Sequence, residues 1–138
     1  MERVIALDVG SKTIGLATAS MRARLAQPLM TLKRISVKKD VVRLAEICSQ
    51  HRIDGIVVGL PLMLDGSEGR SARLARQVGD ALGSELDLTV HYYDERFSSV
   101  SAEEFLKQQG KSYNRRRKEI DQAAAAVILS QWLDSLTF

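Results

Sequence analysis

The stretch Arg3-Val-Ile-Ala-Leu-Asp8-Val-Gly10 decides the fold of this chain, together with the residues that follow it, Ser11-Lys-Thr-Ile-Gly-Leu-Ala17. Five of the six residues from Val4 to Val9 are apolar, and three of them are β-branched, which is typical of a strand buried on both faces. Gly10 permits a tight turn directly after this strand. The pattern therefore predicts a core strand that doubles straight back into a second strand.

Asp8 is the one acid in this apolar run. Burying an unpaired carboxylate costs several kcal/mol, so Asp8 must lie at an exposed strand end, pair with a cation or ligate a metal ion. The alternative is an acid that only caps or solubilises the turn, which is common at strand ends.

The rest of the chain alternates between strand and helix patterns. We expect strands near residues 13–20, 27–32, 53–59 and 86–93, and helices near 38–50, 71–82, 98–110 and up to about 135. A helix between two buried strands indicates a parallel pair with a right-handed crossover. The predicted fold class is α/β: a five-stranded mixed sheet of three antiparallel N-terminal strands followed by parallel strands, flanked by helices.

The composition is that of an ordinary globular protein, with 138 residues, 45% of them hydrophobic and 27% charged. This length predicts one domain over residues 1–138. The single cysteine, Cys48, excludes an intramolecular disulfide framework and fits a reducing compartment. We find no signal peptide and no membrane-spanning run, so we expect a cytoplasmic protein without a membrane partner. The net charge of +3 favours an anionic partner.

Three acids stand where packing does not call for an acid. Asp8 ends the first strand, Glu95 follows the last strand, and Asp121 lies on the inward face of the final helix with Ala125 and Ile128. If the first and last strands are near neighbours, the three carboxylates converge. Carboxylates without histidine or thiolate partners are ligands for Mg²⁺ or Mn²⁺, and two such ions can cleave a phosphodiester.

Each acid also has a simpler explanation when it is taken alone. Asp121 could favour the positive end of its helix dipole. Glu95 could pair with Arg96 on a solvated turn.

Basic residues gather just before Asp121, where five of the eight residues from 111 to 118 are basic: Lys111, Arg115, Arg116, Arg117 and Lys118. Such a segment can hold phosphates beside the acids. The alternative is a solvated loop. Arg22 and Arg24 form a weaker second candidate patch.

Four motifs in order resemble the YqgF/RuvX family, and the resemblance covers essentially the whole chain. They are Asp8–Ala17, Val58–Leu62 with Asp65–Gly69, Asp94–Ser99, and Lys118–Leu129. That family comprises RNase H-like proteins described as Holliday-junction resolvase homologues and as pre-16S rRNA maturation nucleases. The resemblance implies an RNase H-like fold, with Asp8, Glu95 and Asp121 as catalytic, metal-binding acids.

It further implies a metal-dependent endonuclease that processes the 5′ end of pre-16S rRNA. We expect Lys12, Arg70 and Arg96, together with the basic residues of 111–118, to contact the nucleic acid. The expected partners are pre-rRNA or branched DNA and ribosomal precursor particles, bound by a monomer or a homodimer.

Three alternatives stay open at this point. One is a Holliday-junction resolvase, which would need a dimer to cut two strands. The second is a non-catalytic ribosome-assembly factor that binds nucleic acid. The third is an ATPase of the actin or hexokinase type, because Asp8–Gly15 resembles their phosphate loop, although those folds need two such domains.

Overall fold

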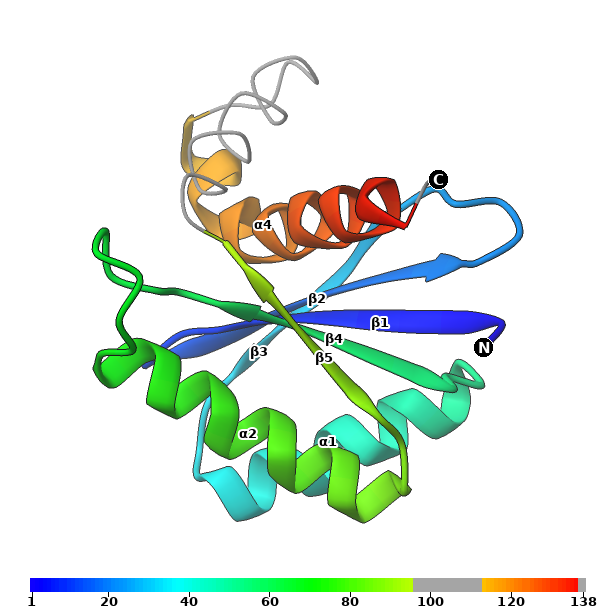
Figure 1. Cartoon of the computed structure of the whole chain (residues 1–138), viewed down its shortest axis with the longest axis horizontal. Helices are drawn as coiled ribbons and strands as arrows, with labels where there is room; N and C mark the ends of the chain where they lie inside the picture. The colour runs from blue at the N-terminus through cyan, green and yellow to red at the C-terminus, as the bar shows by residue number, and fades with distance from the viewer. Residues whose placement is uncertain (96–112, 137–138) are drawn as a thin grey trace.

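A mixed sheet of five strands organises the protein (Figure 1). The computed structural model describes residues 1–95 and 113–136, with side chains for 1–95 and 121–136. The strands are β1 (Arg3–Val9), β2 (Thr13–Ser20), β3 (Gln27–Lys33), β4 (Gly55–Leu60) and β5 (Val90–Asp94), in the spatial order β3-β2-β1-β4-β5. The first three strands pair antiparallel, whereas β1, β4 and β5 are parallel. The predicted fold class is confirmed.

Helices cover both faces of this sheet (Figure 1). The helices α1 (Val37–Gln50) and α2 (Arg70–Leu86) pack on one face, and α4 (Tyr113–Ser135) packs on the other. The side chains of β1 alternate between two cores: Ile5 and Leu7 face the first pair of helices, while Val4 and Ala6 face α4. This explains why the first strand is apolar on both faces. Among the described residues, no helix has the length and hydropathy needed to span a membrane.

Two predicted element boundaries are wrong. Helix α2 continues past Leu82 to Leu86, so the last strand begins at Val90. The helix ends where Asp87 adopts the left-handed conformation at φ 54°, which aspartate tolerates better than most residues. The final helix, α4, begins at Tyr113, so residues 113–118 of the basic segment are helical and do not form the loop that was considered as an alternative. The helix expected over 98–110 lies outside the described residues.

Helix α4 lies directly on β2 at Gly15. A Cβ atom added to Gly15 would overlap the carbonyl group of Asp121. The next turn of the helix consists of four buried alanines, from Ala123 to Ala126, which allow the same close approach. Gly15 therefore fixes both the height of α4 above the sheet and the position of the Asp121 backbone.

We predict that Gly15→Ala destabilises the protein by roughly 2–3 kcal/mol, because the added methyl group must push the helix backbone away. Urea denaturation measures the loss. Gly69→Ala is the matched control, since its Cβ would meet only the flexible side chain of Met63, at 3.2 Å from Sδ. If Gly15→Ala were as mild as Gly69→Ala, the close contact between α4 and β2 would be wrong.

Candidate active site

Asp8 lies at the end of β1, where it is the register partner of Gly15 on β2. Its carboxyl group is largely buried, and no described cation forms an ion pair with it. Burial, and then the negative charge of Asp121, raise the pKa of Asp8 to about 6. Within residues 1–95 and 121–136, Asp8 therefore has no cation partner of the kind that was considered from the sequence.

Glu95 reaches toward Asp8 from the far side of β4. It follows β5 directly, and its backbone N–H donates to the carbonyl of Leu60 at 3.2 Å. A Cβ atom at Gly59 would overlap Glu95 Oε2, so only glycine leaves room for this side chain over β4. The first and last strands are near neighbours, with β4 between them, and β4 carries a glycine at the point that Glu95 crosses.

The environment of Glu95 disfavours a charged carboxylate. Burial raises the pKa of Glu95 to about 8, with further contributions from the charges of Asp8 and Asp94. Its Oε2 atom is buried and has no hydrogen-bond partner among the described atoms. A buried oxygen without a partner usually marks a missing water or ion, or a functional role.

Asp121 is held over the start of β2 by two contacts. Its backbone lies against Gly15, and its Oδ2 accepts a hydrogen bond of 2.5 Å from Thr13 Oγ1. Thr13 was not among the residues predicted to belong to the site. Its only signal was its position at the start of the strand that returns from Asp8.

The three acids therefore meet at one end of the sheet, where β1 and β5 finish and β2 begins. We call this the carboxylate end, defined by Asp8, Glu95 and Asp121. Asp8 interacts electrostatically with both of the others. In the described part of the chain, however, no group of three His, Cys, Asp or Glu side chains is already arranged to hold a metal ion. Asp8 thus interacts with Glu95 and with Asp121, but the three side chains do not form one ready-made group of metal ligands.

Two of the predicted basic residues lie near the carboxylate end. Lys12 is exposed in the turn between β1 and β2, and Arg70 is exposed as the first residue of α2. For the four basic residues from Arg115 to Lys118, the structure gives the backbone in the first turns of α4, ahead of Asp121. Arg96 and Lys111 lie outside the described residues.

The weaker candidate patch, Arg22 and Arg24, follows the far end of β2 and is separated from the acids by the length of that strand. There Arg24 donates to the backbone carbonyl of Leu133 near the end of α4.

Arg34, which was also not predicted from the sequence, holds the turn after Asp8 by hydrogen bonds. Its Nη1 donates to the carbonyl of Gly10 at 3.3 Å, and its backbone N–H donates to the carbonyl of Lys12 at 2.9 Å. Its Nε donates to Asp40 Oδ2 at 3.0 Å, and Asp40 is buried. The turn that carries Lys12 is thus tied to the start of α1.

The sequence is similar to that of a known family over nearly its whole length. Residues 2–135 match the family model RuvX, described as Holliday junction resolvase. A Myxococcus xanthus protein is 44% identical over 96% of this chain and 88% of its own length, and its name is "Putative pre-16S rRNA nuclease". A Thermosynechococcus vestitus protein with the same name is 41% identical over 98% of this chain and 89% of its own length.

Solved structures share the fold at much lower sequence identity. RuvC of T. thermophilus, in complex with a Holliday junction substrate, superposes with a TM-score of 0.61 at 18% identity, over 98% of this chain and 95% of that one. The Fowlpox virus resolvase, in complex with Holliday junction DNA, gives a TM-score of 0.64 at 11% identity over 99% of both chains. These likenesses confirm the RNase H-like fold.

The raised pKa values predict how the stability of the metal-free protein depends on pH. Because the folded pKa values of Asp8 and Glu95 lie above the ordinary 3.8 and 4.5, folding favours their protonated forms. Their contribution is complete at low pH and is lost as pH rises through about 6 and about 8. Between pH 5 and pH 8 the double variant Asp8→Asn/Glu95→Gln should therefore gain stability relative to the parent, by roughly 1–3 kcal/mol.

Urea denaturation in a chelator at several pH values checks this expectation. Asp54→Asn is the control, because hydrogen bonds from the Arg3 and Glu2 backbone lower the pKa of Asp54, and its titration falls below this window. That variant should keep the parent's slope of stability against pH. Equal slopes for the parent and the double variant would show that the two acids are not in the strained environment described.

Proposed function

The chain belongs to the RuvX family, described as Holliday junction resolvase, and from this premise we propose that it is a metal-dependent endonuclease acting on structured nucleic acid, with pre-16S rRNA as its substrate. Members of the family with more than 40% identity are named as nucleases, so the chain is a phosphodiester-cleaving hydrolase. The observation that carries the metal dependence is the buried Oε2 of Glu95, which has no described hydrogen-bond partner although its carboxyl group interacts with that of Asp8.

Asp8, Glu95 and Asp121 would hold the metal. All of their donor atoms are oxygens, which suits Mg²⁺ or Mn²⁺. Glu95 Oε2 lies over Gly59 and has no hydrogen-bond partner among the described atoms, so it is available to a metal ion. Because Asp8 is the acid that interacts with both others, it would be shared by the two pairs Asp8–Glu95 and Asp8–Asp121. Bound divalent ions would activate a water molecule and neutralise charge on the phosphate.

The residues around the acids control their charge and orientation. Near neutral pH Glu95 keeps its proton until a cation displaces it, since its pKa is raised to about 8. Thr13 donates to Asp121 Oδ2 and so leaves the other oxygen of that carboxylate for a ligand. Lys12 and Arg70, which flank the carboxylate end, would bind the phosphates next to the one that is cleaved.

Pre-16S rRNA, free or in a precursor particle, is favoured over branched DNA because it is named for the relatives of 41–44% identity. The second candidate, a Holliday-junction resolvase acting as a dimer, rests on the family description and on neighbours of 11–18% identity. Family membership also favours the nuclease over the ATPase that the Asp8–Gly15 motif resembled.

We predict that Asp8→Asn abolishes cleavage, lowering the rate by roughly 100-fold or more, while the variant stays folded. A cleavage assay with Mn²⁺ on a pre-16S rRNA 5′ leader and on a four-way DNA junction measures this and compares the two substrates. Asp54→Asn removes an exposed carboxylate at the opposite end of β1 and should keep full activity. Metal-dependent cleavage by Asp8→Asn at the parent's rate would overturn the catalytic assignment.

The basic residues at the start of α4 should bind phosphates as charges, without reading bases. Neutralising one that contacts a phosphate lowers the slope of log affinity against log salt by about one, whatever the nucleic-acid sequence. Binding of Arg115→Ala, Arg116→Ala and the double variant, compared with Arg22→Ala at the far end of β2, tests this. Slopes equal to that of Arg22→Ala in all three variants would remove this segment from the substrate path.

A further inference from the structure

A second concentration of positive charge lies where β3 leads into α1. Residues 33–43 contain five basic side chains and one acid, a net charge of +4, which exceeds the +3 of the whole chain. We call this region the β3–α1 surface, defined by Lys33, Ile35, Lys38, Lys39, Val42 and Arg43. None of these residues belongs to the site described above.

The β3–α1 surface combines charge with an apolar groove. A groove of about 460 Å³ is lined by Ile35, Lys38, Lys39, Val42 and Arg43. Its apolar members are exposed, Ile35 at 62% and Val42 at 53%. Within α1, spacings of three and four residues place Lys38, Lys39, Val42 and Arg43 on one side of the helix, and Ile35 adjoins them just before the helix begins. Val41 and Leu44 bury the opposite side of α1 in the core. Exposed aliphatic side chains rimmed by lysines indicate a contact surface.

The one acid of this region pairs with arginines and leaves the lysines uncompensated. Asp40 is buried and accepts hydrogen bonds from Arg34 Nε and from the backbone of Ile35, both at 3.0 Å, and its Oδ1 lies 3.8 Å from Arg43 Nη1. Lys33, Lys38 and Lys39 are exposed, and they form no ion pair with any described side chain. These ammonium groups are therefore available to an anionic partner.

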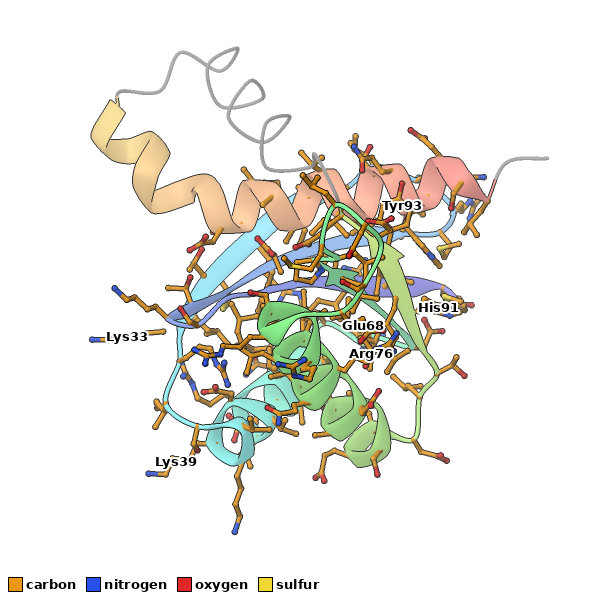
Figure 2. All side chains as sticks on the ribbon, turned by 60° about the vertical axis from the view of Figure 1, so that its left-hand side comes forward. Lys33, Lys39, Glu68, Arg76, His91 and Tyr93 are labelled. Atoms are coloured by element: carbon orange, nitrogen blue, oxygen red, sulfur yellow. The ribbon has the colours of Figure 1, made fainter. Side chains whose placement is uncertain are left out.

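The β3–α1 surface is continuous with the carboxylate end. Lys33 is the register partner of Thr13, so the two side chains lie on the same face of the sheet, where Thr13 contacts Asp121. Arg34 joins the same region to Gly10 and Lys12 through the hydrogen bonds given above. In Figure 2, Lys33 and Lys39 both extend into solvent on the same side of the molecule.

We propose that the β3–α1 surface binds the sugar–phosphate backbone of the substrate on one side of the cleaved bond, as a continuation of the Lys12 contact. This inference rests on the proposed nuclease function and adds a binding surface to it. Lysines bind phosphates as point charges and read no sequence. Sugar and base faces supply apolar surface to cover Ile35 and Val42. An acidic protein segment would match the charge too, but it would not account for the continuity with the acids.

Binding of a pre-16S rRNA leader, measured against salt in a chelator so that no cleavage occurs, tests the proposal. Lys38→Ala/Lys39→Ala should lower the salt slope by ~1.5–2 and weaken binding at least ~10-fold at ~0.1 M salt. The matched control is Arg22→Ala/Arg52→Ala, which removes two exposed charges at the opposite end of the sheet and should keep the parent's slope. Val42→Lys adds a charge inside the groove and should tighten binding, whereas Val42→Glu should weaken it.

The outcomes separate this proposal from the nuclease assignment. A slope for Lys38→Ala/Lys39→Ala equal to that of the control, with no effect of either Val42 variant, would overturn the β3–α1 surface as a nucleic-acid site even if the parent cleaves RNA. An acidic protein segment would then be the better occupant. If the lysine variant loses slope while the parent shows no metal-dependent cleavage, the binding surface stands and the nuclease function fails.

Discussion

The constraint on which the rest of the structure depends is that the fold holds Asp8 close to two other carboxylates at one end of its sheet. Their electrostatic interaction is unfavourable when they are charged. Asp8 raises the pKa of Glu95, and Asp121 raises that of Asp8, although burial is the larger cause for both. Such an arrangement costs stability unless protons or cations relieve it. Strongly perturbed pKa values of this kind are typical of functional sites.

Two glycines allow the three carboxylates to come close together. Gly59 leaves the space through which Glu95 crosses β4, and Gly15 lets the backbone of α4 rest on β2. With a side chain at either position, one of the acids would have to move away from Asp8. The hydrogen bond from Thr13 orients the side chain of Asp121, and the hydrogen bond from Arg34 to Gly10 holds the turn after Asp8. The site is thus built mainly by close backbone approach, with few side-chain contacts.

Much of this could be predicted from the sequence, because local patterns determine it. The apolar run around Asp8, the return strand and the inward face of α4 led to the fold class and to the candidate acids. The end of α2 could not be predicted, since it depends on a left-handed aspartate, Asp87, instead of the usual glycine. The roles of Thr13, Gly59 and Arg34 were invisible because each depends on a contact with a residue distant in the chain.

The most direct test of the account is a calorimetric titration of the protein with Mn²⁺ at pH 7 in buffers of different ionisation heat. If the three acids form the metal site, binding should release about one proton, chiefly from Glu95, whose pKa is raised to about 8. Glu95→Gln should bind more weakly and release almost none. Absence of Mn²⁺ binding, or binding by the parent without proton release, would contradict the central claim that these carboxylates form a metal site in which a proton on Glu95 relieves the repulsion until a cation binds.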